Sequence, residues 1–219
     1  STHCISSAAS DVYKRQSQGW GMTETGPGSL VLDASDALRK IGSCGKPVLY
    51  NEVQIVDDKL KKVGVDEVGQ LIVRGPNVTP GYWGSSEANE TDFSDGWLKT
   101  GDAAKVDREG YFYIVDRIKD MFISGGENVY PAEIENVLYE LPGILEVAVI
   151  GIPDEKWGEV GMAVVVCNPQ LVLEEGVILD HCSKHLAKYK VPKRAVFTAE
   201  IPKTASGKIQ KTLLLDLFE

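Results

Sequence analysis

Residues 115–141 read VDRIKDMFISGGENVYPAEIENVLYEL, and they decide the fold because a pattern typical of strands ends there and a helical pattern begins. Pro131 stands just before the helical pattern, and proline is favoured at the first position of a helix. Four apolar side chains then follow at the i, i+3, i+4, i+7 spacing of one helix face. They are Ile134, Val137, Leu138 and Leu141. We therefore expect an amphipathic helix near the start of a separate domain.

The two sides of this stretch differ in pattern. Upstream, short apolar runs alternate with Gly, Pro and Asp, which predicts a small β-rich subdomain with closely spaced strands. These strands are expected at 52–57, 69–74 and 110–116. Downstream, strands and helices interleave, which predicts a compact α/β domain. Its strands are expected at 145–152, 162–167 and 195–198, and its further helices at 174–187 and 209–217. The predicted fold class is therefore α/β (α+β).

Three regions follow from these patterns. Residues 1–16 are rich in Ser and Ala and show no sustained period, so we expect a disordered or foreign leader. Residues 17–117 hold the β-rich part. Residues 118–219 hold the α/β domain, whose length of about 100 residues is usual for a domain.

The composition of the 219 residues narrows the function classes. A net charge of −9 argues against nucleic acid as the main partner, because phosphate backbones attract basic faces. The four cysteines lie far apart, which indicates neither a zinc site nor a disulfide framework and fits a reducing cytoplasm. No apolar run reaches the length of a transmembrane helix, and no signal-peptide pattern is present. A cytoplasmic protein is expected, with peripheral membrane contact and oligomeric state left open.

The first chemical motif is QGWGMTET at 18–25. Glycines let a backbone approach a phosphate closely, a threonine hydroxyl can donate to it, and a carboxylate can hold Mg²⁺. The same residues also fit a glycine-rich turn with a helix-capping threonine, and the motif by itself leaves both interpretations open.

Two further motifs lie before the expected helix. Thr100-Gly101-Asp102 predicts an aspartate held by a tight turn, which can accept two vicinal ribose hydroxyls or serve as an ordinary turn residue. The charged run at 115–120 lies where the two patterns meet, and by itself it is typical of a solvated linker.

The last two motifs lie in the α/β domain. The paired glycines of ISGGENVYP at 123–131 can line a narrow passage or make a turn. In PKTASGKI at 202–209, Lys208 follows Ser-Gly on an expected mobile loop. Its ammonium can swing toward a phosphate, or it can be an exposed lysine that begins the last helix.

In this order and spacing, the five motifs resemble those of the adenylate-forming superfamily of acyl- and aryl-CoA synthetases, luciferases and peptide-synthetase adenylation domains. The resemblance runs from Gln18 to the C-terminus, and the stretch 123–158 is similar in particular to the fatty-acyl-CoA synthetase branch. It implies that residues 17–117 are the end of an AMP-binding N-terminal domain, and that residues 118–219 are the superfamily's C-terminal domain. It also implies ATP, Mg²⁺, CoA and a fatty or other carboxylic acid as substrates and activating ion, without a permanently bound cofactor.

The resemblance assigns roles for the first half-reaction, in which a carboxylate attacks the α-phosphate of ATP. Thr23 would contact that phosphate, and Glu24 would hold Mg²⁺. Asp102 would bind the ribose hydroxyls with Arg117 as its partner. Lys208 would stabilise the charge that develops between phosphate and carboxylate. The implied nucleotide-binding set is Gly19, Trp20, Gly21, Met22, Thr23, Asp102, Arg117 and Lys208, with Trp20 packing by the adenine where relatives usually have tyrosine.

For the second half-reaction, in which a thiol displaces AMP, the resemblance implies a domain rotation. Lys119 matches the hinge position. The CoA-binding set implied is Gly125, Gly126, Trp157, Tyr189, Lys193 and Arg194, and core packing remains an equal alternative for Trp157. A tyrosine face suits adenine, and cations suit phosphates.

The chain also departs from the superfamily pattern. The Ser/Thr/Gly-rich phosphate loop ending in Pro-Lys-Gly is absent from these 219 residues, as are the larger acyl-binding subdomains. We expect a truncated portion of a fatty-acyl-CoA synthetase that is inactive alone. The alternatives are another acid:CoA ligase, for an aryl or dicarboxylic acid, and a non-catalytic C-terminal binding module.

Overall fold

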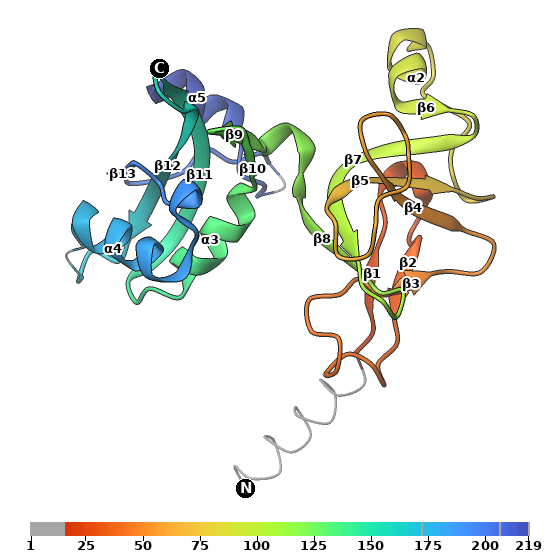
Figure 1. The fold of residues 1–219 in the computed structure, drawn as a ribbon, viewed down its shortest axis with the longest axis horizontal. Coiled ribbons are helices and arrows are strands. Elements are labelled where there is room, and N and C mark those ends of the chain that lie inside the picture. The colour runs from red at the N-terminus through yellow and green to blue at the C-terminus, as the bar shows by residue number, and fades with distance from the viewer. Residues whose placement is uncertain (1–15, 172, 206, 219) are drawn as a thin grey trace, which may run out of the picture. The chain divides into compact units, whose positions relative to one another are not determined.

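A computed structural model describes residues 16–171, 173–205 and 207–218, and the expected leader lies outside these ranges apart from Gln16. Along its sequence the chain divides into two compact units, unit 1 at residues 1–115 and unit 2 at 116–219 (Figure 1). Unit 1 has two sheets and one buried apolar cluster, and unit 2 has one sheet with a buried apolar cluster on each face.

Unit 1 is built on two antiparallel sheets. The smaller has the order β1-β2-β3, with β1 at Gln18–Trp20, β2 at Leu30–Leu32 and β3 at Lys46–Pro47. The larger has the order β4-β5-β7-β6, and β8 also pairs with β7. Its strands are β4 (Glu52–Val56), β5 (Gly69–Arg74), β6 (Phe93–Ser94), β7 (Trp97–Val106) and β8 (Phe112–Arg117), the last ending beyond the unit boundary. Two short helices complete it, the 3-10 helix η1 (Thr23–Thr25) and α2 (Ser86–Asp92).

The core of unit 1 joins these sheets. Its buried members are Leu30, Cys44, Ile55, Leu71, Ala104 and Phe112, and the half-buried Trp20 packs against them. Burial also raises the pKa of the Cys44 thiol to about 11, with the nearby Asp102 carboxylate a lesser contribution, so this thiol stays protonated near neutral pH.

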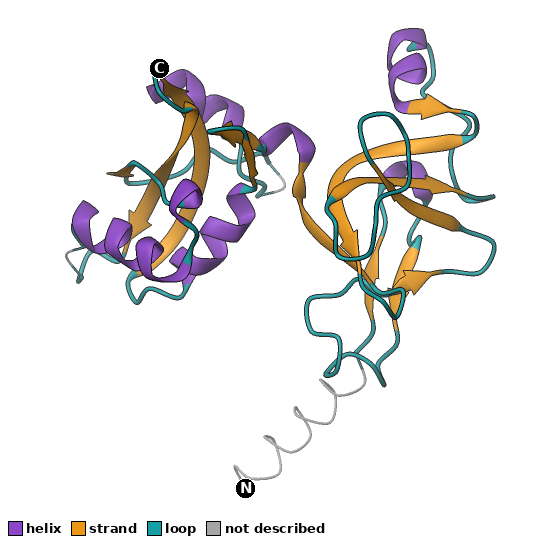
Figure 2. Cartoon of the chain, viewed as in Figure 1, coloured by secondary structure: helices purple, strands orange, loops and turns teal. Residues whose placement is uncertain are grey.

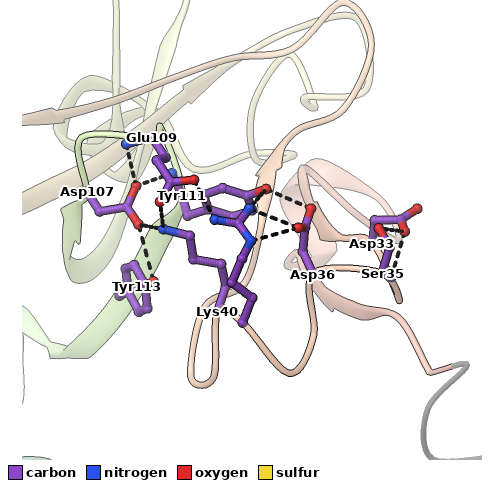
Figure 3. A network of polar contacts seen from close by, with 9 residues as sticks. Asp33, Ser35, Asp36, Lys40, Asp107, Glu109, Tyr111 and Tyr113 are labelled. Carbon is purple, nitrogen blue, oxygen red and sulfur yellow. Dashed lines mark hydrogen bonds and ion pairs between the residues drawn. The ribbon is translucent and has the colours of Figure 1, made fainter.

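A polar network holds the segment 33–46 against the turn between β7 and β8 (Figure 3). The Lys40 ammonium lies 2.6 Å from Asp107 Oδ2 and 2.6 Å from Glu109 Oε1. Tyr111 donates its hydroxyl to Asp36 Oδ2 at 2.7 Å, which closes the network from the other side. Side-chain contacts therefore help to hold this segment, which contains no helix or strand before β3 begins at Lys46.

Unit 2 contains one five-stranded sheet. Its order is β10-β9-β12-β11, and β13 pairs with β12 as the parallel member. The strands are β9 (Phe122–Ser124), β10 (Glu127–Val129), β11 (Ile144–Asp154), β12 (Gly158–Cys167) and β13 (Arg194–Phe197). The helices are α3 (Pro131–Tyr139), α4 (Glu175–His185) and α5 (Lys211–Phe218), with the 3-10 helices η2 (Ile118–Asp120) and η3 (Lys188–Lys190).

Both faces of this sheet are covered by helices (Figure 2). Side chains alternate along a strand, so Val147 and Val149 join one cluster with residues of α3 and α4. Ala148 and Ile150 join the opposite cluster with Leu214 of α5. This double burial explains why the expected strands read as continuous apolar runs.

The predicted α/β (α+β) class is confirmed, and the helix opened by Pro131 buries Ile134 and Leu138 as expected. The helix expected at 174–187 ends earlier, at His185, because Leu186 is extended and η3 follows. Among the described residues, none of the helices is both long and apolar enough to cross a membrane.

Candidate functional site

The first motif forms β1 and the single turn η1. Thr25 is fully buried, and its hydroxyl accepts a hydrogen bond from the Met22 amide at 3.0 Å. Thr23, by contrast, is exposed, as is Gly21. The turn is therefore held by Thr25, and the exposed Thr23 hydroxyl remains available for a ligand.

Glu24 is held by a residue that belongs to none of the five motifs. Tyr82 donates its hydroxyl to Glu24 Oε1 at 3.1 Å, and the Thr79 amide donates to the Glu24 carbonyl at 2.7 Å. Burial and this hydrogen bond raise the pKa of Tyr82 to about 12, so the phenol remains a donor. Tyr82 follows Gly81 in a loop, and no sequence spacing relates it to Glu24.

The structure brings Trp20 and Asp102 together although they lie far apart in sequence. The indole Nε1 donates to Asp102 Oδ2 at 3.0 Å. Asp102 is only 4% exposed. Buried polar groups need hydrogen-bond partners, and Trp20 supplies one for Asp102.

The tight turn expected at Thr100-Gly101-Asp102 is wrong. These residues lie inside β7, where the pairing with β5 shifts register between Gln70 and Ile72. Gly101 has φ +72°, a left-handed angle that glycine tolerates, and the Thr100 hydroxyl donates to the Leu71 carbonyl at 2.8 Å. A strand bulge, rather than a turn, fixes Asp102.

The charged run contributes Arg117 and Lys119 to unit 2. Arg117 ends β8 with an exposed side chain, and its amide donates to Asp116 Oδ1 at 2.7 Å. Lys119 is exposed within η2. Its neighbours Ile118 and Asp120 are half-buried, and the hinge role of Lys119 stays a prediction.

The paired glycines form the turn between β9 and β10, two short strands where the sequence indicated only a passage or a turn. The Gly125 amide donates to the Trp157 carbonyl at 2.9 Å. Both glycines have positive φ, +63° at Gly125 and +89° at Gly126. A Cβ added at Gly125 would lie 2.8 Å from Trp157 Cε3, whereas nothing lies within 4 Å at Gly126. Gly125 is therefore required for close packing with Trp157.

A cavity of about 200 Å³ lies beside this turn. It is lined by Ser124, Trp157, Val160, Lys188, Tyr189, Val191 and Lys193. Three members of the expected CoA set, Trp157, Tyr189 and Lys193, thus meet at one place. Arg194 lies next along the chain in β13 with an exposed side chain but does not line the cavity. The other four lining residues, Ser124, Val160, Lys188 and Val191, were not expected from the sequence.

An ion pair beside the cavity fixes η3. Lys190 donates to both oxygens of Glu133 on α3, at 2.7 and 2.6 Å. Within the described residues, no ion pair is formed by Lys188 or Lys193. Lys190 is thus neutralised by Glu133, whereas the ammonium groups of Lys188 and Lys193 beside the cavity can bind an anion.

Lys208 is exposed on a short loop whose ends are tied together, and Ser206 of the same loop lies outside the described residues. The Thr204 amide donates to the Lys208 carbonyl at 2.8 Å, and the Lys208 amide donates to Thr204 Oγ1 at 3.1 Å. Beyond the loop, Lys211 lies 2.7 Å from Glu135 of α3. The loop thus presents Lys208 to solvent from a fixed base.

No group of three or more His, Cys, Asp or Glu side chains gathers as a metal site in the described part of the chain. A single carboxylate such as that of Glu24 can still contribute to a magnesium site, since Mg²⁺ is often bound by one or two carboxylates together with substrate phosphates.

Comparisons with known proteins agree with these features. The family model described as AMP-binding enzyme matches residues 5–83, and the AMP-binding enzyme C-terminal domain matches 133–208. A feruloyl-CoA synthase of an Amycolatopsis species is 50% identical over 194 residues, 89% of this chain and 40% of that protein. The long-chain-fatty-acid–CoA ligase FadD13 of Mycobacterium tuberculosis is 44% identical over 203 residues, 92% of this chain and 40% of the ligase.

A solved structure is also similar. The o-succinylbenzoate CoA synthetase of Bacillus subtilis, in complex with its acyl-adenylate intermediate, superposes with a TM-score of 0.86 at 40% identity, covering 90% of this chain and 40% of that one. The chain thus spans about two fifths of the length of these relatives. With two family models matched and these relatives at 40–50% identity, the chain belongs to the adenylate-forming superfamily of AMP-binding enzymes.

Proposed function

We propose that this chain is part of an AMP-forming acid:CoA ligase. Residues 17–117 would be the end of its AMP-binding domain, and residues 118–219 its C-terminal domain. In the first half-reaction a substrate carboxylate attacks the α-phosphate of ATP, giving acyl-adenylate and pyrophosphate. In the second, the thiol of CoA attacks the acyl carbon, giving the thioester and releasing AMP.

We assign each nucleotide-binding role to a single residue. Asp102 would accept the ribose hydroxyls, with Arg117 as its partner. Trp20 would lie by the adenine, and its neighbours Gly19, Gly21 and Met22 would also contact the nucleotide. Thr23 would donate to the α-phosphate. The Lys208 ammonium would stabilise charge on the attacking carboxylate and that phosphate, as preorganised donors do in transition states. Mg²⁺, when held by Glu24 and the phosphates, would neutralise phosphate charge.

Support for ATP and Mg²⁺ comes from the relatives as well as from the site. The similar o-succinylbenzoate CoA synthetase has also been solved with ATP and a magnesium ion. In this chain, the hydrogen bond from Tyr82 takes one oxygen of Glu24 and orients its carboxylate. The carboxylate is half-buried rather than enclosed, which suits an ion that arrives with a substrate.

The observation that carries the CoA assignment is the cavity of unit 2. Two aromatic side chains, Trp157 and Tyr189, and two cations, Lys188 and Lys193, surround it beside the Gly125 turn. Aromatic faces suit an adenine, and lysines suit phosphates. The exposed Arg194 would add a further phosphate contact, and the turn of Gly125 and Gly126 would border the path of the pantetheine arm.

The acid itself is assigned by likeness alone. We propose a fatty acid, because the stretch 123–158 is similar to the fatty-acyl-CoA synthetase branch. An aromatic acid is supported equally well, since the relatives include a feruloyl-CoA synthase and an o-succinylbenzoate CoA synthetase beside the fatty-acid ligase.

The proposal is tested by titrating the chain with CoA and following binding calorimetrically. Lys193→Ala should weaken CoA binding about tenfold, the effect expected for one charged hydrogen bond to phosphate. Lys184→Ala is the matched control, because Lys184 is an exposed lysine of α4 that pairs with Asp180 of its own helix. Equal affinity of the two variants, or no binding by the unchanged chain, would contradict the CoA assignment.

A further inference from the structure

Trp20 makes a side-chain hydrogen bond that gives it a role beyond ring stacking. Its side chain is half-buried against the core of unit 1, so the ring is fixed by packing. From this position the indole Nε1 donates to Asp102 Oδ2 at 3.0 Å. An indole N–H can only donate a hydrogen bond, so Asp102 must be the acceptor in this pair.

Asp102 is fixed from its backbone side as well. The Asp102 amide donates to Thr100 Oγ1 at 3.1 Å, and the same hydroxyl donates to the Leu71 carbonyl on β5 at 2.8 Å. The bulge at Gly101 sets the direction in which the side chain leaves β7. These bonds fix the backbone position of Asp102. Rotation about its side-chain bonds is restricted by the groups that the carboxylate contacts. Trp20 provides such a contact.

We infer that Trp20 is a positioning and specificity-determining residue for the ribose of the bound nucleotide. It acts through Asp102: the indole N–H holds the carboxylate in the orientation that accepts two vicinal hydroxyls. The inference rests on the proposed nucleotide-binding role of Asp102. Its consequence is that Trp20 favours nucleotides with both ribose hydroxyls, a preference that ring stacking alone does not produce.

The hydrogen bond itself can be tested without any ligand. The chain has four tryptophans, so its ¹H–¹⁵N spectrum contains four indole signals, and Trp20→Phe identifies the one that belongs to Trp20. Asp102→Asn keeps the size of the side chain and removes its charge. It should shift the Trp20 indole signal while leaving that of the fully exposed Trp83 unchanged. An unmoved Trp20 signal in folded Asp102→Asn protein overturns the inference.

A second experiment compares the affinity of the chain for AMP with its affinity for 2′,3′-dideoxy-AMP, which lacks both ribose hydroxyls. Trp20→Phe should weaken AMP binding about tenfold and leave dideoxy-AMP binding much less affected, because the lost bond acts on the hydroxyls. Trp20→Tyr keeps a ring with a terminal donor and should retain more of the preference. Trp83→Phe is the control and should bind both ligands as the unchanged chain does.

The outcomes separate the inference from the proposed function. If Asp102→Asn loses AMP binding while Trp20→Phe keeps the full preference for AMP, the inference fails and the ribose role of Asp102 stands. If Asp102→Asn binds AMP as tightly as the unchanged chain, or if the unchanged chain binds no AMP, the proposed nucleotide site fails. An equal loss of both ligands in Trp20→Phe would assign Trp20 to stacking and overturn the inference.

Discussion

Gly125 shows how a single backbone position can set the shape of a site. Its left-handed φ of +63° brings the chain around so that the turn lies directly against the Trp157 ring. The paired glycines indicated a turn in the sequence. Nothing in the sequence spacing of Gly125 and Trp157 indicated that the turn would pack against the Trp157 ring. The contact depends on β9 and β12 pairing at Ser124 and Gly158, which only the folded sheet supplies.

The two glycines of this turn allow a matched test of that contact. Gly126→Ala should cost about 1 kcal/mol of unfolding free energy, since alanine is strained at positive φ but meets open space there. Gly125→Ala should cost about 1–3 kcal/mol more, because its methyl group would overlap the Trp157 ring.

Urea unfolding followed by Trp157 fluorescence measures both variants, with Trp20→Phe, Trp83→Phe and Trp97→Phe as a background that leaves one tryptophan. Equal destabilisation by the two alanines would mean that the ring moves aside at no cost. The close contact would then have no structural consequence.

Among the elements, the segment 33–45 is held by ion pairs in addition to its backbone hydrogen bonds (Figure 3). Burial opposes ionisation of Asp107, but hydrogen bonds from Lys40 and from the amides of Tyr111 and Glu109 outweigh it and lower the pKa of Asp107 to about 2. A carboxyl group whose pKa is lower in the folded state stabilises the fold above its unfolded pKa. This contribution is therefore present above about pH 4 and lost as the pH falls toward 2.

Unit 1 should accordingly become easier to unfold between about pH 4 and pH 2, and Asp107→Asn should remove part of this dependence. The variant is expected to be less stable than the unchanged chain at pH 6, with the difference between them shrinking at pH 2.5. Asp58→Asn, which changes an exposed aspartate between β4 and β5, serves as the control. Urea midpoints at both pH values give the comparison, and a constant difference between Asp107→Asn and the unchanged chain would contradict the assignment.

The sequence predicted elements well where burial imposes a period. The helix after Pro131 and the strands at 145–152 and 69–74 appear as expected because their apolar spacing reflects the faces they bury. It failed at β7, where Gly101 and Asp102 resemble a turn in composition but sit in a strand bulge. It also missed β9 and β10, since three-residue strands are too short to show a period.

For the candidate sites, the sequence supplied the residue types and the structure supplied the neighbours. Trp20 and Asp102 come from separate motifs, and Tyr82 belongs to none of the five. Trp20 meets Asp102 through a contact between the smaller and the larger sheet of unit 1, and Tyr82 meets Glu24 from a loop. Local sequence patterns do not encode such long-range contacts.

At the scale of the whole molecule, each unit has its own buried core, and the chain spans about two fifths of its relatives' length. We predict that the 219-residue chain releases no pyrophosphate when given ATP, Mg²⁺ and either dodecanoic or ferulic acid. It contains no Ser/Thr/Gly-rich loop ending in Pro-Lys-Gly. Backbone amides of such glycine-rich loops provide the grip on phosphates that this chemistry needs. Acid-dependent pyrophosphate release by the purified chain would contradict the prediction.

Joining the chain behind the N-terminal three fifths of the similar feruloyl-CoA synthase should restore acid-dependent pyrophosphate release. In that chimera, Lys208→Ala should slow adenylation by about 10²–10³-fold, the loss seen when one preorganised donor to a developing charge is removed. Thioester formation from supplied feruloyl-adenylate and CoA should be nearly unchanged, because the α-phosphate is then only part of the leaving group. Lys203→Ala is the control, since Lys203 lies on the same loop but pairs with Glu146. Equal slowing of both half-reactions by Lys208→Ala would show that Lys208 supports the fold of the loop rather than the chemistry of adenylation.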